Sequence, residues 1–473
     1  MRRQLWTWAA LLAASLIILC AVPGQYLGRQ QDDLLYIISS HALASGSYRL
    51  FTSPGQPPIT MIMPGFPILL LPVTWLAGNW YGLYQAFCAL ILAGLPWLIW
   101  RWLRRGPRLE PAGNAIPALL IALLFATNPM VLTQAGTVMS EGAYTALALL
   151  LLTAIENNRA PAAGGLLLAL TQLRPAGLSL IPAALYRPWR DGDRRSALWT
   201  ALPAALGLLA WWAWSLYASG YVDEAREIHF SYAGHPWLQP WYVAADNARY
   251  YLRSWAGSYL PPRWNAAAGP LGLLLLPVAI RGLWRLWRQE PARPAILMLA
   301  GAGLMHAFWA WQYERYLIPL LPWLLWALAA GAGTKARWLL SALLCLQLSS
   351  HHRLWTSRPA AAPELSRTYA WIASHTQPSD IIASPMYVRD GFLCGRPSLA
   401  LPDTPDPAEF AQALRRRQAR FVIWQDGLDI GLSADRTATL RLRLDRIRGQ
   451  LQDSGGFRLV QQEASEGARI YEL

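Results

Sequence analysis

Charged residues are scarce in this chain of 473 residues. They make up 14% of it, against 54% hydrophobic residues, and 41 bases outnumber 27 acids. A soluble enzyme of this length would carry more charge, so the composition favours a multi-span membrane protein. The 26 tryptophans agree with this, because aromatic side chains anchor at the two membrane interfaces. The bases fall in short clusters between apolar runs, which is typical of cytoplasmic loops and does not indicate a nucleic-acid partner.

Cysteines are few as well, and several sequence signatures are missing. The four cysteines are scattered without a CxxC pair, so they indicate neither a disulfide framework nor a zinc site. Since no glycine-rich phosphate loop follows a strand, nucleotide binding is not indicated. The two halves of the chain show no internal symmetry, which counts against a transporter built on inverted repeats.

Long apolar runs fill residues 1–350, and we expect them to form a transmembrane module. A bilayer core of about 30 Å needs roughly 20 apolar residues in a helix. If the basic clusters between successive apolar runs are assigned to the cytoplasm, the runs predict about eleven spans and a cytoplasmic N-terminus. External loops are expected at 24–79, where the piece 64–78 lies along the interface, and at 219–267. The single spans are predicted at 5–23, 80–100, 114–133, 142–155, 197–218, 269–287, 294–311, 316–333 and 337–350.

The stretch "GGLLLALTQLRPAGLSLIPAALYRPWRDGDRR", residues 164–195, presents a conflict of topology. As a single crossing it would leave the arginines of 187–195 outside, against the positive-inside bias. Two short helices hinged at "RPAG" keep that cluster inside and bring Arg174 to the outer side. We therefore predict a hinged pair.

From residue 351 the pattern changes to that of a small soluble α/β domain, which we expect outside the cytoplasm. Its expected role is that of a structural or acceptor-facing lid and not of a second catalytic unit. Helices are predicted at 363–376, 406–418 and 434–453, and strands at 380–384, 420–424, 457–462 and 468–473.

Ionisable residues near a membrane are costly and therefore mark candidate sites. Five of them fall on the predicted outer face, in separate loops, as in a pocket built between helices. The acids could instead cap helix starts, and the arginines could snorkel at span ends. The scattered histidines are more often structural residues than metal ligands. The five are Asp32, Asp33, Glu141, Arg174 and Arg315.

Acids combined with arginines suit the transfer of a group from an anionic lipid. The planar guanidinium of arginine binds phosphate oxygens in pairs. A carboxylate can take the proton from an incoming hydroxyl as a general base. One group would hold the leaving phosphate, and the other would activate the nucleophile.

Several motifs in register resemble the GT-C superfamily of glycosyltransferases that use polyprenyl-phosphate sugars. This superfamily includes protein O-mannosyltransferases and the lipid A aminoarabinose transferase. The resemblance covers most of residues 1–350, and the α/β tail is similar to tails on many bacterial members. The motifs are "DDLLY" followed by "PP" and "PGFP", then "SEGAYTALALLLL", "GGLLLALTQLRPAGLSLIP" and "QYERYLIPLLP".

The resemblance implies roles for the acids. The first acid of the family's pair is its catalytic base and falls on Asp32, while Asp33 is expected to support or orient it. Glu141 is implied to contact the acceptor or a metal. Many members have Glu where this chain has Asp33. The glutamate and histidine that bind metal in some relatives have no obvious match, so a divalent metal is left open and no other cofactor is indicated.

The resemblance also implies roles for the cations and two tyrosines. Arg174 at the hinge would hold the lipid phosphate, and Arg315 would act on it from another side. Tyr36 and Tyr316 would line the pocket. The aromatic-rich "HPWLQPWY" of loop 219–267 suits stacking on sugar or isoprenoid, although tryptophans are equally ordinary interface anchors.

Together these features predict a polytopic α-helical membrane protein of GT-C type in a bacterial inner membrane, with its C-terminal domain in the periplasm. The expected activity is an inverting transfer of a sugar from a polyprenyl-phosphate donor to a hydroxyl acceptor on a lipid, glycan or protein. A polymerase or ligase of lipid-linked glycans shares the architecture, and a non-enzymatic carrier of polyprenyl phosphate would need similar cations. Both remain alternatives.

Overall fold

The chain folds into two compact units in the computed structural model. Unit 1 comprises Met1–Gln25 and Met63–Arg358, and unit 2 comprises Tyr26–Ile62 and Pro359–Leu473. The side chains of residues 2, 3, 31, 239 and 350–356 lie outside the description. The structure describes residues 2–21, 27–28, 31–78, 80–105, 115–218, 239–309, 311–356, 365–402, 404, 406–426, 445–452 and 456–473.

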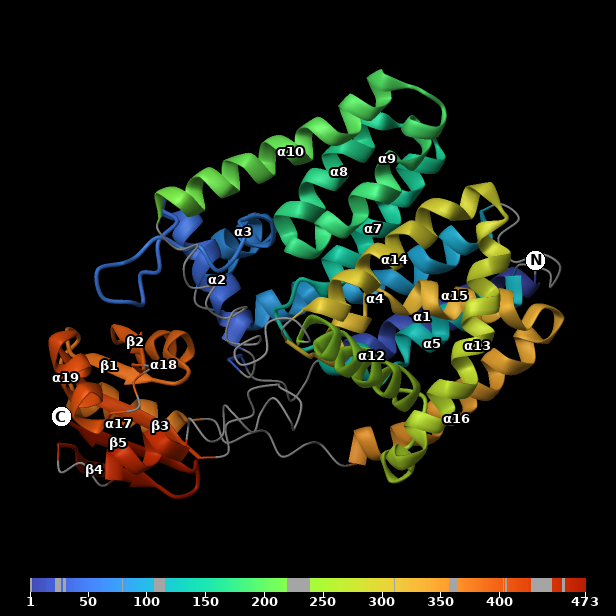
Figure 1. Cartoon of the computed structure of the whole chain (residues 1–473). Helices are drawn as coiled ribbons and strands as arrows, with labels where there is room; N and C mark the ends of the chain where they lie inside the picture. The colour runs from blue at the N-terminus through green and yellow to red at the C-terminus, as the bar shows by residue number, and fades with distance from the viewer. Residues whose placement is uncertain are drawn as a thin grey trace. The chain divides into compact units, whose positions relative to one another are not determined.

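The regular elements that the structure describes in unit 1 are all helices (Figure 1). Its α-helices are α1 (Arg2–Cys20), α3 (Gly65–Ala77), α4 (Gly82–Arg104), α5 (Ala115–Ala126), α6 (Pro129–Gln134), α7 (Glu141–Glu156), α8 (Ala160–Leu173), α9 (Ile181–Arg190), α10 (Arg194–Tyr217), α12 (Gln239–Gly257), α13 (Ala268–Trp287), α14 (Arg293–Phe308), α15 (Leu321–Ala332) and α16 (Ala336–Thr356). Its short 3-10 helices are η1 (Pro175–Leu180), η2 (Pro262–Ala267), η3 (Glu290–Ala292), η4 (Glu314–Leu317) and η5 (Gly333–Lys335).

Small residues let the helices of unit 1 approach closely. A Cβ added to Gly282 in α13 would collide with the carbonyl oxygen of Ala327 in α15. At Gly164 in α8 it would collide with the carbonyl oxygen of Trp199 in α10. Glycine at such crossings brings two backbones together, which is how helices associate where lipid offers no hydrophobic drive. The pairs α13 with α15 and α8 with α10 are accordingly among the most extensively packed in the unit.

Three described helical stretches are long and apolar enough to cross a membrane: Gly82–Arg104, Arg194–Tyr217 and Pro262–Trp287. Other predicted spans coincide with shorter helices, such as α1 and α5. The count of about eleven spans therefore stays a prediction.

The predicted hinge at "RPAG" is confirmed. Helix α8 ends at Leu173, and Arg174 is extended with φ −155° and ψ 148°. The chain then forms η1 and continues as α9. The cause is local, because a proline disfavours helical geometry in the residue before it, and Pro175 follows Arg174.

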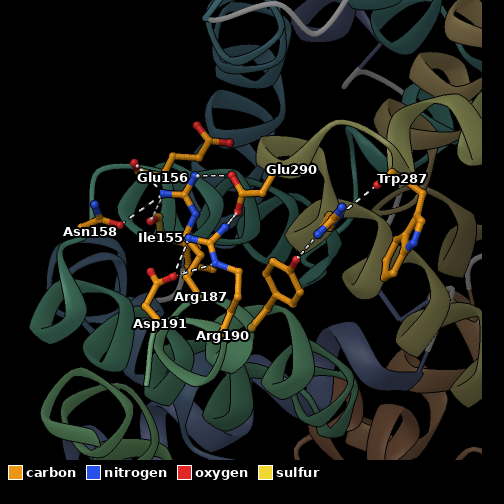
Figure 2. Close-up of polar contacts among 10 residues, drawn as sticks. Ile155, Glu156, Asn158, Arg187, Arg190, Asp191, Trp287 and Glu290 are labelled. Carbon is orange, nitrogen blue, oxygen red and sulfur yellow. Dashed lines mark hydrogen bonds and ion pairs between the residues drawn. The ribbon is translucent and has the colours of Figure 1, made fainter. Parts of the chain in front are cut away.

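A group of arginines ties the far end of this hinged pair to its neighbours (Figure 2). Arg187 in α9 donates to the carbonyl oxygens of Ile155 (3.1 Å) and Glu156 (3.0 Å), the last residues of α7. Arg190 forms an ion pair with Glu290, which begins η3 between α13 and α14. A cation at a helix C-terminus satisfies carbonyls that lack intrahelical partners and opposes the helix dipole. Helix α9 is thus fastened to α7 and to the α13–α14 turn.

The segment 219–267, predicted to be an external loop between two spans, contains helices. Residues 219–238 lie outside the described residues, and the remainder includes α12 and η2. Val243 and Asn247 are buried four residues apart, and Trp255 and Ala256 are buried further on. This is helical spacing, and the aromatic residues between these positions disguise it in the sequence.

Unit 2 contains a mixed sheet of order β2-β1-β3-β5-β4. Strand β1 pairs in parallel with β2 and β3, whereas β5 is antiparallel to both β3 and β4. Its elements are α2 (Gln31–Ala44), α17 (Ser366–His375), β1 (Ile381–Ser384), α18 (Tyr387–Cys394), β2 (Ser398–Ala400), α19 (Pro407–Arg416), β3 (Ala419–Gln425), β4 (Arg458–Glu463) and β5 (Ala468–Glu472).

Alternation along β3 explains the two cores of this sheet. Phe421 and Ile423 belong to one buried cluster with Ile372 of α17, and Val422 belongs to another with Phe410 of α19. Successive side chains of a strand point to opposite faces, so the one strand supplies both clusters. Helix α18 and strand β2 had no counterpart in the sequence prediction. Of the helix predicted at 434–453, residues 434–444 and 453 lie outside the described residues, and 445–452 are helical.

Residues 26–62 belong with the C-terminal domain and not with the membrane module to which the sequence assigned them. The carbonyl oxygen of Thr52 accepts from the backbone N–H of Ser398 at 2.8 Å, at the start of β2. Phe51 contacts Phe392 of α18, with ring centroids 6.5 Å apart. Because such contacts join residues more than 300 positions apart, local sequence patterns do not indicate them.

Candidate functional site

Three of the predicted site residues meet within unit 1. Glu141 is the first residue of α7, Arg174 lies at the hinge, and Arg315 lies in η4. Arg174 Nη1 lies 2.6 Å from Glu141 Oε1, and Arg315 Nε lies 3.4 Å from the same oxygen. One carboxylate therefore contacts both guanidinium groups.

The three charged side chains of this cluster are largely buried. The side chains of Glu141 and Arg315 are 1% and 4% exposed, while that of Arg174 is 16% exposed. Charges this deeply buried persist when they are paired, because removing an isolated charge from water is costly. Both guanidinium groups therefore lie against one carboxylate oxygen, and Arg174 is the most exposed of the three side chains.

Tyrosine rings complete the surroundings of the arginines. The guanidinium carbon of Arg174 lies 5.1 Å from the centroid of the Tyr316 ring, and that of Arg315 lies 5.5 Å from it. Arg315 also lies 4.3 Å from the ring of Tyr313. A cation over an aromatic face is attracted by the ring quadrupole, more strongly where water is excluded. Tyr316 thus lies beside both arginines, and Tyr313 is a neighbour that the sequence prediction missed.

Helix α12 holds the backbone that carries Arg315. The side-chain amide of Asn247 donates to three carbonyl oxygens at the end of α14: His306 (2.9 Å), Ala307 (3.0 Å) and Trp309 (2.9 Å). Gln312 in turn donates to the side-chain oxygen of Asn247 at 2.8 Å. Orphan carbonyls at a helix end need such partners. Asn247 and Gln312 were not among the predicted residues, although the "DN" of α12 and the "WQYE" before Arg315 are polar residues in apolar surroundings.

The acid next to Arg315 differs from Glu141. Glu314 is exposed, and the Ser254 hydroxyl donates to its carboxylate at 3.4 Å.

Helix α7 also supports the hinge directly. The Tyr144 hydroxyl, one turn after Glu141, donates to the carbonyl oxygen of Ala176 at 3.1 Å. A Cβ at Gly177 would lie 2.5 Å from the carbonyl carbon of Leu170, so only glycine lets η1 fold back on α8 at this distance. The position of Arg174 is therefore set by the backbone on both sides of it.

Asp32, Asp33 and Tyr36 lie in α2 of unit 2, and Tyr36 is buried there. Both carboxylate oxygens of Asp33 accept from the backbone N–H of Gly28 at 3.1 Å, and the side chain is fully buried. Asp32 is partly exposed. The two adjacent acids thus differ, since one fixes the turn before the helix and the other is open to solvent.

A metal site was left open by the sequence. Across the described ranges, histidine, cysteine, aspartate and glutamate side chains form no group of three or more that could hold a metal ion. Glu141, which the resemblance linked to acceptor or metal, has its carboxylate between two arginines. The acids and histidines that the structure describes therefore do not fit a metal ion.

Comparison with solved structures concerns the whole chain. ArnT from Cupriavidus metallidurans, bound to undecaprenyl phosphate, aligns with a TM-score of 0.54 at 13% identity, over 98% of this chain and 97% of that one. The apo structure of the same ArnT aligns with a TM-score of 0.54 at 13% identity, over 100% and 98%. The chain has the ArnT fold.

The fold therefore agrees with the one that the sequence resemblance predicted. Since the alignment with ArnT covers nearly the whole chain, it includes residues of both units. No protein-family model and no curated protein sequence matches the chain.

Proposed function

We propose that the chain is an inverting glycosyltransferase that moves a sugar from a polyprenyl-phosphate donor to a hydroxyl acceptor at the outer face of the membrane. The observation that carries this proposal is the buried cluster in which Glu141 contacts both Arg174 and Arg315. Its two guanidinium groups suit the phosphate of a lipid-linked donor. The ArnT fold supports the same assignment, because that ArnT was solved with undecaprenyl phosphate bound.

The cluster would act on the leaving group. When the bond between the anomeric carbon and the phosphate oxygen breaks, its electron pair stays on that oxygen, and a phosphodiester becomes a doubly charged monoester. Arg174, the more open arginine, would bind this phosphate, while Arg315 adds positive charge behind it. Charge that develops in a water-poor site is stabilised strongly by cations already in place. A phosphate leaves as a stable anion, so no strong general acid is required.

Asp32 would act on the nucleophile. Its carboxylate takes the proton of the acceptor hydroxyl while that oxygen forms a bond to the anomeric carbon from the face opposite the phosphate, which inverts the configuration. Asp33 is suited to orient this base, because it holds the preceding turn through Gly28. The proton ends on Asp32, the sugar on the acceptor, and the polyprenyl phosphate is released.

The proposed location is a bacterial inner membrane, which supplies the donor. The N-terminus would lie in the cytoplasm and the C-terminal domain in the periplasm. The partners are the lipid-linked donor and a hydroxyl acceptor on a lipid, glycan or protein. Lipid-linked glycan donors, as used by polymerases and ligases, present the same phosphate chemistry.

The test is Asp32→Asn in a deletion strain, at matched expression, with glycolipids and glycoproteins profiled by mass. We expect the sugar-bearing product to disappear, since asparagine cannot accept the hydroxyl proton. Glu409→Gln, which alters an exposed acid of α19, is the matched control and should leave the product unchanged. A wild-type profile in Asp32→Asn would refute the assignment, and lipid movement without any sugar transfer in the wild type would favour the carrier.

A further inference from the structure

The C-terminal domain contacts the turn that precedes the acid pair. Gly28 has φ +88°, and a Cβ there would lie 2.8 Å from Cγ and 3.0 Å from Cδ of Arg389. Glycine is required at this position for two reasons. The backbone is left-handed, and the stem of Arg389 occupies the space that a Cβ would fill. The side chain of Arg389 in α18 therefore lies directly against the turn at Gly28.

The same turn is held from the other side by Asp33. Its buried carboxylate accepts from the Gly28 N–H at 3.1 Å through each oxygen. Asp33 follows Asp32 in the first turn of α2, so a shift of Gly28 would move both acids. The Gly28 backbone is thus enclosed by Asp33 on one side and Arg389 on the other.

Arg389 is itself fixed by a buried polar network. Its Nε donates to Asp390 Oδ1 at 2.7 Å, and its Nη2 donates to the side-chain oxygen of Gln425 at 3.0 Å. Asp390 also accepts from the hydroxyls of Tyr369 (2.8 Å) and Ser384. Bonds to charged partners in a buried setting are strong and geometrically specific.

The network draws on the core of the α/β domain. Ser384 and Gln425 are the last residues of the parallel strands β1 and β3, and Tyr369 belongs to α17. Burial and the neighbouring Asp390 carboxylate raise the pKa of Tyr369, so this hydroxyl remains a donor at neutral and mildly alkaline pH. A side chain anchored to two core strands is a rigid support.

We propose that Arg389 is a positioning residue for Asp32: its stem, anchored by Asp390 and Gln425, holds the Gly28 turn and with it the first turn of α2 in the geometry that proton transfer requires. The inference rests on the proposed function, in which Asp32 is the base. It also assigns a role to the C-terminal domain, which is to support the segment that carries the base.

Hydrogen exchange on the full-length protein in lipid nanodiscs tests the support directly. Arg389→Ala should raise exchange at the amides of residue 28 and residues 34–37 by about tenfold or more, because the packed stem that holds the Gly28 turn is removed and local opening becomes easier. Arg389→Lys keeps the methylene stem over Gly28 and should lie between Arg389→Ala and wild type. Arg420→Ala, which removes a half-exposed arginine of β3, is the control and should leave these amides protected.

Transfer and donor affinity then separate positioning from general damage. In Arg389→Ala the sugar-bearing product should fall about tenfold or more, whereas affinity for undecaprenyl phosphate stays at the wild-type value, because Arg174 and Arg315 belong to unit 1. If Arg389→Ala accumulates too poorly for measurement, Gly28→Ala tests the same contact from the other side and should show the same pattern.

Wild-type exchange at these amides, or wild-type product in the presence of raised exchange, would overturn the proposal. So would an equal fall in product and in lipid affinity, which indicates general destabilisation. Failure of the proposed function has a different signature, namely wild-type product in Asp32→Asn while Arg389→Ala still raises exchange in α2.

Discussion

Glu141 is the acid that both arginines of the cluster contact. It contacts Arg174 and Arg315 through the same oxygen, Oε1, at 2.6 and 3.4 Å. A buried carboxylate next to both guanidinium groups offsets part of the cost of removing these charges from water. A phosphate that approaches Arg174 would therefore meet a cation already oriented and largely desolvated.

At this scale we expect Arg174→Ala to weaken binding of undecaprenyl phosphate about tenfold to a hundredfold, the effect typical of losing a bond to a charged group. Affinity is measured on purified protein in nanodiscs by native mass spectrometry. Arg159→Ala is the matched control, because Arg159 is exposed at the opposite end of the same helix, α8. Equal affinities in wild type and Arg174→Ala would remove the arginine from the proposed donor site.

At the scale of elements, the hinge of α8, η1 and α9 is what places Arg174. Three constraints act on it: Pro175 after the arginine, the Tyr144 hydroxyl on Ala176, and the close passage of Gly177 against Leu170. The backbone here has little room to relax. Arg174 can therefore be displaced without any change to a charged residue.

Gly177→Ala is expected to reduce undecaprenyl phosphate affinity by about fivefold or more although it removes no charge, because the added methyl must push the backbone apart. Gly165→Ala provides the control, since Gly165 lies in α8 and a Cβ there meets nothing within 4 Å. The same binding measurement applies to both variants. If both bind the lipid equally well, the hinge is more compliant than its contacts indicate.

The hinge shows what the sequence could predict and what it could not. Pro175 and the arginines of 187–195 carry local and topological signals, so the break in the helix was predictable. The pairing of Glu141 with two arginines was not, because a helix-capping acid or a snorkelling cation has the same appearance in sequence. Asn247 bonds to the backbone of His306, which lies 59 positions further along the chain, and no local pattern records such a contact.

At the scale of the whole molecule, the chain interrupts its helical unit to contribute residues 26–62 to the α/β unit. The sequence placed the boundary at residue 350 because composition changes there. It could not assign the earlier segment to the later domain, since the hydrogen bond between Thr52 and Ser398 spans 346 residues. The α/β unit is therefore complete only when this early segment and the C-terminal residues have come together.

The predicted membrane topology can be tested with tags at the two ends of the chain. With the N-terminus in the cytoplasm and eleven spans, an epitope tag after Leu473 should be accessible to a protease added to intact spheroplasts. A tag before Met1 should be protected until the membrane is opened, which makes it the internal control. Protection of the C-terminal tag in intact spheroplasts would mean that the span count is even.

The contacts at the two ends of α7 constrain the length of this helix. Arg174 meets its first residue, Glu141, and Arg187 meets the carbonyl oxygens of its last two residues. Both arginines belong to the hinged segment that runs from Arg174 through η1 and α9, so this one segment contacts α7 at both of its ends. One inserted residue would advance the helix by about 1.5 Å and turn it by about 100°, and both contacts could not then be kept. The number of residues in α7 is thereby constrained as strictly as the identity of its first acid.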